Sequence, residues 1–119
     1  MARILVVDDE PAERFLVGRT LRKAGHNVTV AEDGAEGLQA VLESPPDLVV
    51  TDVMMPVMDG LELIRRLRGD PATADIPILA ASGDPRLAVA ADAVLKKPYE
   101  ATSLIEMVQA LLKEGSDRR

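Results

Sequence analysis

Polar residues suited to metal and phosphate chemistry follow short apolar runs at several points in the sequence. Asp8 and Asp9 follow RILVV, Asp52 follows LVVT, Ser82 follows ILAA, and Lys97 comes two residues after AVL. If these runs are neighbouring parallel strands, the polar side chains meet at one edge of a sheet. Three carboxylates at one dry site would repel one another and raise at least one pKa, so the site needs a counter-charge. The pattern therefore predicts a site for Mg2+, which prefers oxygen ligands.

Such a site could also carry out phosphoryl transfer. With a cation bound, one carboxylate can stay ionised, and aspartate carboxylates form covalent phosphate intermediates. The cation and a lysine such as Lys97 would screen the phosphoryl oxygens in the transition state. A hydroxyl such as Ser82 could donate a hydrogen bond to one of them. These residue types predict a carboxylate that accepts phosphate.

The elements that must position these residues alternate along the chain. Apolar runs predict strands at residues 3–7, 27–31, 48–51, 78–81 and 93–95, and helical patterns separate most of them. Strands separated by helices indicate a parallel sheet covered on both faces, and right-handed crossovers make it doubly wound. We therefore expect an α/β fold of the flavodoxin-like type, a five-stranded sheet in the order 2-1-3-4-5.

The helices are predicted from apolar periodicity and capping patterns. Asp33 with Glu36, and Asp59 with Glu62, have the spacing of a capping box. The residues expected to face inward are Leu16, Val17, Leu21 and Ala24 before Gly25; Leu38, Val41 and Leu42; Leu61, Ile64 and Leu67; and Leu104, Ile105, Val108, Leu111 and Leu112. We expect one domain over residues 1–114 and a flexible tail over residues 115–119.

Taken together, these residues resemble the receiver domain of two-component response regulators, including single-domain chemotaxis regulators. The resemblance rests on Asp8-Asp9 after the first strand, Asp52 followed by Met55-Pro56 and Asp59-Gly60, Ser82 after the fourth strand, and Lys97-Pro98 after the fifth. It covers nearly the whole chain, up to about residue 113. The five motifs occur in the family's order on the expected elements.

The resemblance implies a role for each of these residues. Asp52 would be the phosphoacceptor, and Asp9 and Asp52 would ligate Mg2+ directly, with the backbone carbonyl of Met54 as a third protein ligand and Asp8 acting through water. Lys97, often followed by a cis proline bond, would contact the phosphoryl group, and Ser82 would be the switch hydroxyl. The phosphate would come from a histidine kinase, a histidine phosphotransfer protein or a small phosphodonor.

The same resemblance implies that the domain catalyses its own phosphorylation and slow autodephosphorylation, and that it acts on a downstream protein target. It would not be a conventional turnover enzyme. Two departures from the family pattern concern the output side. Only residues 83–92 connect the fourth and fifth strands, so we expect a shortened or irregular fourth helix. Val94 stands where many members carry an aromatic residue.

Composition restricts the other functions. The 119 residues carry a formal net charge of -6, which is unfavourable for binding a nucleic-acid backbone. The absence of cysteine excludes disulfides and thiolate metal sites. No apolar run is long enough to span a membrane, so we expect a cytoplasmic protein.

Two alternatives remain open. The first is a protein-interaction domain that works without phosphorylation, which the altered fourth-helix region motivates. The second is a Mg2+-dependent hydrolase with an aspartyl nucleophile. That chemistry needs an acid two residues after the nucleophile, and Met54 occupies the position.

Overall fold

The computed structural model of the chain describes residues 2–84 and 90–118. Its centre is a five-stranded parallel sheet in the order β2-β1-β3-β4-β5. The strands are β1 (Arg3–Val7), β2 (Asn27–Ala31), β3 (Leu48–Asp52), β4 (Ile78–Ser82) and β5 (Ala93–Lys96). The predicted strand order and parallel arrangement are confirmed, and the last three strands each run one residue further than expected.

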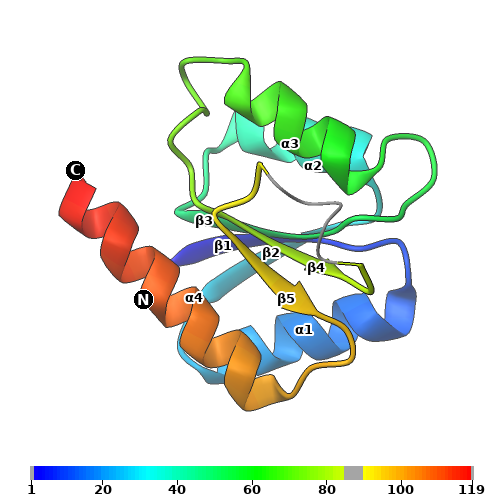
Figure 1. Cartoon of the computed structure of the whole chain (residues 1–119), viewed down its shortest axis with the longest axis vertical. Helices are drawn as coiled ribbons and strands as arrows, with labels where there is room; N and C mark the ends of the chain where they lie inside the picture. The colour runs from blue at the N-terminus through cyan, green and yellow to red at the C-terminus, as the bar shows by residue number, and fades with distance from the viewer. Residues whose placement is uncertain (1, 85–89, 119) are drawn as a thin grey trace.

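Within the described residues, four helices cover the two faces of the sheet. They are α1 (Pro11–Lys23), α2 (Gly34–Glu43), α3 (Gly60–Arg68) and α4 (Ala101–Arg118). Figure 1 shows α2 and α3 on one face and α1 and α4 on the other. Successive residues of a strand point to opposite faces of the sheet. In β1, Leu5 and Val7 pack under α2 and α3, whereas Ile4 and Val6 pack under α1 and α4. Two aliphatic cores therefore hold the central strands rigidly in place.

Both predicted capping boxes occupy the starts of helices. The Asp33 carboxylate accepts a 2.8 Å hydrogen bond from the backbone N–H of Glu36, and Asp59 accepts one of 2.9 Å from Glu62. Each bond satisfies a donor that has no partner inside its helix. The caps fix where α2 and α3 begin.

Several helix residues expected to face inward are exposed instead: Leu16, Ala24, Leu42 and Leu61. The positions that do contact the sheet include glycines, because Gly18 in α1 and Gly37 in α2 are buried. A Cβ built on Gly37 would lie 2.9 Å from a Val7 methyl group, so α2 lies directly on β1. Glycine therefore occupies inward positions in α1 and α2, which a count of apolar residues does not reveal.

The C-terminal helix follows its predicted stripe. Leu104, Val108 and Leu111 are buried, and Ile105 and Leu112 are half-buried. The helix continues to Arg118, into the segment expected to be a flexible tail. The domain limit at residue 114 stays a prediction. Among the described helices, none is both long and apolar enough to cross a bilayer.

The connection between β4 and β5 is described only at its two ends. Gly83 and Asp84 form a bend after β4, and residues 90–92 form a turn that leads into β5. The predicted short or irregular helix falls on residues 85–89, which lie outside the described residues. That prediction is therefore neither confirmed nor contradicted.

Val94, in contrast, is described. It is half-buried in β5 and packs against the core under α2 and α3.

Candidate functional site

The carboxyl ends of the central strands bring the predicted site residues together. In the sheet register Val7 pairs with Thr51, so the next residues, Asp8 and Asp52, lie at the same end of neighbouring strands. Asp52 pairs with Ala81, and Ser82 with Lys96. Parallel pairing thus places these groups along one edge, as expected for a doubly wound sheet.

Lys97 connects two acids at this edge. Its Nζ lies 3.0 Å from Asp52 Oδ1 and 3.1 Å from Glu13 Oε2. Burial alone would lower the pKa of Lys97, but the hydrogen bonds to Asp52 and Glu13 raise it above the ordinary lysine value. The Lys97–Pro98 peptide bond is cis, as the resemblance implied. Lys97 is therefore a fully charged ammonium that contacts the predicted phosphoacceptor.

The Asp52 carboxylate is held in one orientation. Its Oδ1 accepts the bond from Lys97 and a second bond of 2.9 Å from the Val53 backbone N–H. The side chain is only 12% exposed, so a reactant can approach from a narrow range of directions. Both donors bind Oδ1, so the other carboxylate oxygen, Oδ2, faces away from them. The group is positioned as a nucleophile would be.

Gly60 lies against the backbone of Asp52 and Val53. The Gly60 N–H donates a 2.8 Å hydrogen bond to the carbonyl of Val53. A Cβ built on Gly60 would lie 2.1 Å from the Asp52 carbonyl oxygen, so any other residue would push the start of α3 away from the end of β3. The Asp-Gly pair at residues 59 and 60 thus has two structural purposes, a helix cap and a close backbone approach.

Asp8 is the buried acid of the site, only 6% exposed. Its pKa is raised to about 6, chiefly by burial and in part by the nearby Asp52 charge, while the hydrogen bond from the Glu10 N–H opposes the shift. The Arg14 guanidinium donates to the Asp8 backbone carbonyl at 2.8 Å. Lys97 lowers the Asp8 pKa, but not enough to offset the cost of ionising a buried carboxyl group.

The arrangement of these acids fits a hard cation. Carboxylate oxygens of Asp8, Glu13 and Asp52 all lie within 4.8 Å of one another. Oxygen donors of this kind are the ligands that Mg2+ prefers, and a bound cation would compensate the charge of these neighbouring carboxylates. This group could therefore hold Mg2+, and it shares Asp8 and Asp52 with the ligands that the sequence predicts.

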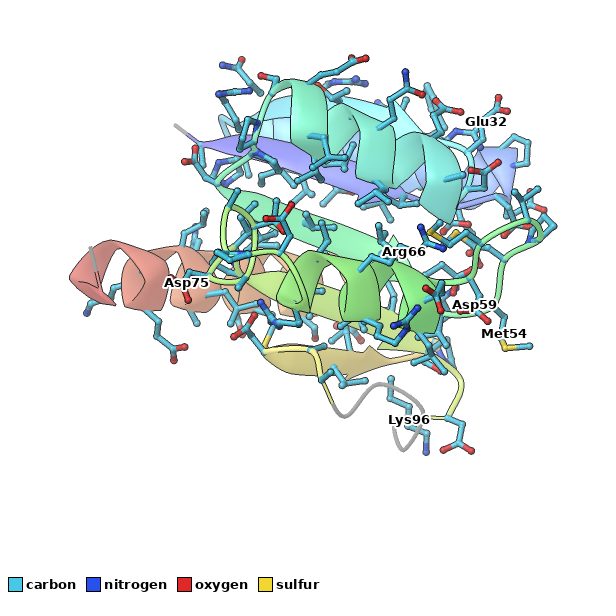
Figure 2. The ribbon with its side chains drawn as sticks, turned by 90° about the horizontal axis from the view of Figure 1, so that it is seen from above. Glu32, Met54, Asp59, Arg66, Asp75 and Lys96 are labelled. Carbon is cyan, nitrogen blue, oxygen red and sulfur yellow. The ribbon has the colours of Figure 1, made fainter. Side chains whose placement is uncertain are left out.

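Two of the predicted ligands lie outside this group of three acids. Asp9 is exposed beside Asp8. The Met54 side chain is 71% exposed, and Figure 2 shows it pointing outward from the molecule. The prediction for Met54 concerns its backbone carbonyl, so the side-chain direction does not bear on it. The ligand roles of Asp9 and Met54 stay predictions.

Ser82 is in the predicted place, at the end of β4, and is 3% exposed. Its hydroxyl donates to the Asp84 carbonyl at 3.0 Å and accepts from the Asp84 N–H at 3.0 Å. The hydroxyl is therefore bonded to the loop that follows it. To donate a hydrogen bond to a phosphoryl oxygen, the hydroxyl would have to release the Asp84 carbonyl.

Glu13 and Arg14 are site residues that the sequence reasoning missed. They come from the first turns of α1 rather than from a strand end, so a search of strand ends does not reach them. A usable signal was present, since Glu13 lies one helical turn after Asp9, on a helix that begins beside the site. A guanidinium nitrogen of Arg14 also lies 3.9 Å from Oε1 of Glu32, the residue that follows β2.

Comparison with known proteins confirms the family resemblance. The family model described as the response regulator receiver domain matches residues 4–109. The DNA-binding dual master transcriptional regulator RpaA of Synechocystis is 39% identical over 120 residues, covering 95% of this chain and 50% of that protein. Response regulator MprA of Mycobacterium tuberculosis is 41% identical over 116 residues, covering 93% of this chain and 50% of that protein.

A solved structure is similar over nearly its whole length. The chemotaxis response regulator CheY4 of Vibrio cholerae superposes with a TM-score of 0.87 at 32% identity, covering 93% of this chain and 98% of that chain. In contrast, the chain spans about half the length of the curated relatives described above.

Proposed function

The chain belongs to the response regulator receiver domain family of two-component signalling, and on that premise we propose that Asp52 is its phosphoacceptor. The phosphoryl group would come from a histidine kinase, a histidine phosphotransfer protein or a small phosphodonor. The observation that carries the proposal is the 3.0 Å contact between Lys97 Nζ and Asp52 Oδ1, at the edge where Asp8 and Glu13 also converge.

In the proposed reaction, Asp52 Oδ2 attacks the phosphorus of the donor. A new bond forms between Oδ2 and phosphorus, the bond from phosphorus to the donor breaks, and its electron pair leaves with the donor. We assign the attack to Oδ2 because Oδ1 accepts the bonds from Lys97 and Val53. The product is an acyl phosphate on Asp52.

Lys97 would supply positive charge to the transferred group. Its ammonium has three N–H donors, so it can contact a phosphoryl oxygen from its place beside Asp52. The Val53 N–H would keep the carboxylate from rotating during attack. Ser82 would donate to a second phosphoryl oxygen after releasing the Asp84 carbonyl.

Mg2+ would be held by Asp9, Asp52 and the Met54 carbonyl, with Asp8 acting through water. When bound, the cation would neutralise carboxylate charge and screen the phosphoryl oxygens. Of these proposed ligands, Asp8 and Asp52 have carboxylate oxygens within 4.8 Å of each other and of Glu13. The same residues would support slow hydrolysis of the acyl phosphate, so the domain would catalyse its own phosphorylation and dephosphorylation only.

The downstream partner would be a protein. RpaA is described as DNA-binding, but the matched region covers about half of it. The net charge of -6 disfavours direct nucleic-acid binding by this chain. We propose that the domain works in the cytoplasm by presenting its phosphorylated state to a target protein or to a further domain.

The test is incubation with Mg2+ and acetyl phosphate, followed by intact-protein mass spectrometry. We expect one added phosphate, acid-stable and base-labile, that requires Mg2+ and is lost in Asp52→Asn. Circular dichroism would confirm that both proteins are folded. Absence of phosphate on the folded wild-type protein would contradict the proposal. Unchanged partner binding by Asp52→Asn would instead favour the phosphorylation-independent alternative.

A further inference from the structure

Glu13 gives Lys97 a second acidic partner, outside the strand ends. It lies in the first turn of α1, and its Oε2 is 3.1 Å from Lys97 Nζ, nearly the same distance as Asp52 Oδ1. The ammonium therefore bridges two carboxylates on different elements. The Glu13 side chain is 48% exposed, so it can turn to solvent without leaving a buried charge.

We propose that Glu13 is a positioning residue that competes with the phosphoryl group for Lys97. The inference rests on the proposed phosphorylation of Asp52. In the unphosphorylated protein Glu13 holds the ammonium, and a phosphoryl group on Asp52 must draw Lys97 away from it. Glu13 thereby sets how readily the site accepts phosphate.

The first argument is the number of hydrogen bonds. An ammonium has three donors, and Asp52 and Glu13 use two of them. A phosphoryl group presents three strong acceptor oxygens with more negative charge than the carboxylate it replaces. If the bond to Glu13 is kept, at most two donors remain for the phosphoryl oxygens, and release of Glu13 makes the third donor available to them.

The second argument is charge. A Glu13 carboxylate oxygen lies within 4.8 Å of oxygens from Asp8 and Asp52. At this separation like charges repel, and the repulsion grows when Asp52 carries a phosphoryl group. Once Lys97 has turned to the phosphate, Glu13 has both lost its cation and gained a stronger anion nearby. Both effects oppose phosphorylation.

Release of Glu13 should be visible at Tyr99. A groove of about 590 Å³ between α1 and the loop from β5 to α4 is lined by Glu13, Leu16, Lys97 and Tyr99, among others. Tyr99 is the single tyrosine of the chain, which has no tryptophan. Its fluorescence therefore reports directly on the wall of the groove that Glu13 shares.

The experiment is a titration of the full chain with beryllofluoride, a phosphoryl mimic, at saturating Mg2+. Binding is followed by Tyr99 fluorescence and, in parallel, by amide proton–nitrogen spectra. Glu13→Gln removes the charge but keeps the side-chain length, and we expect its apparent Kd to fall roughly three- to tenfold. Glu106→Gln, an equal charge change at an exposed position on α4, should bind like the wild type.

A shorter acidic side chain at position 13 distinguishes the effect of the bond to Lys97 from the effect of the negative charge. Glu13→Asp keeps the carboxylate but withdraws it from Lys97, so it should bind the mimic more tightly than the wild type does. The gain of Glu13→Gln should shrink from ~0.01 M to ~1 M salt, where the Debye length falls from about 30 Å to about 3 Å. A change in helix stability alone would not produce this salt dependence.

The outcomes distinguish the two proposals. If the folded wild-type protein does not bind the mimic, the proposed function fails. If it binds and Glu13→Gln has the same or a weaker affinity, the competition is contradicted while the proposed function stands. A weaker affinity together with weaker Mg2+ binding would make Glu13 a metal ligand instead.

Discussion

Lys97 Nζ lies 3.0 Å from Asp52 Oδ1, although 45 positions separate the two residues in the chain. The contact exists because β3 and β5 both end at the same edge of a parallel sheet, with β4 between them. It gives the carboxylate a cation that no neighbour in sequence supplies. The following predictions examine how this edge is built and what it does.

Lys97 should be essential for holding a phosphoryl group. Replacing it by glutamine in Lys97→Gln removes a charge-assisted bond to Asp52. We expect beryllofluoride affinity to fall roughly 10- to 100-fold, as for loss of a bond to a charged group. Lys96→Gln is the matched control, because Lys96 is exposed and Figure 2 shows it pointing outward from β5. Equal losses in the two variants would contradict a specific role for Lys97.

Gly60 should tolerate no side chain. In Gly60→Ala the new Cβ would meet the Asp52 carbonyl oxygen at 2.1 Å, so β3 and α3 must separate. We expect the free energy of unfolding in urea to fall by roughly 1–3 kcal/mol, as for an overpacked core. Gly83→Ala is the control, since a Cβ there meets no atom of the described residues within 4 Å. A Gly60→Ala protein as stable as Gly83→Ala would show that the approach is not tight.

Asp8 should make stability depend on pH. Its pKa is about 6 in the folded protein and 3.8 when unfolded, so the folded state holds the proton more tightly. Between these values stability falls as pH rises, by an amount on the order of 1–3 kcal/mol from this group. Asp8→Asn keeps an acceptor for the Glu10 N–H but cannot ionise.

The measurement is chemical denaturation of both proteins in metal-free buffer. The stability of the wild type relative to Asp8→Asn should decline from about pH 4 to about pH 6 and then level off. Mg2+ should reduce the decline, because the cation compensates the ionised carboxylate. A difference that is constant across this range would contradict a raised pKa.

Arg68 should anchor the end of the connection between β4 and β5. Its guanidinium donates to the carbonyls of Ala74 and Ile76 and pairs with Asp92 at 2.6 Å. We expect Arg68→Ala to lower the free energy of unfolding by roughly 1–3 kcal/mol. Arg65→Ala, which removes an exposed ion pair on the same helix, should change it little. Urea denaturation of the two variants compares the anchor with a surface pair.

The positions of the strands could be predicted because each apolar run is short and bounded by polar residues, and their order followed from the flavodoxin-like fold class. Asp52 and Lys97 were found from sequence for the same reason, since groups at the ends of parallel strands converge. The helix faces were less predictable. Gly37 and Val41 occupy core positions in α2 while Leu42 is exposed, so a pattern that counts only apolar side chains assigns the inward face in part.

The details of the site depend on contacts that sequence spacing does not contain. Glu13 approaches Lys97 from α1, 84 positions away, and its role depends on how closely that helix packs beside β5. Ser82 was placed correctly at the end of β4, but its bonds to Asp84 are a property of the bend that follows. Strand ends identify a site, whereas tertiary packing decides which groups complete it.

The most direct test of the central claim is chemical identification of the phosphorylated residue. After reaction with acetyl phosphate and Mg2+, borohydride converts an aspartyl phosphate to homoserine, which peptide mass spectrometry can locate. We predict homoserine at position 52 in the wild-type protein and none in samples without Mg2+. Homoserine at another aspartate, or phosphate that resists borohydride, would contradict the assignment of Asp52 as the phosphoacceptor.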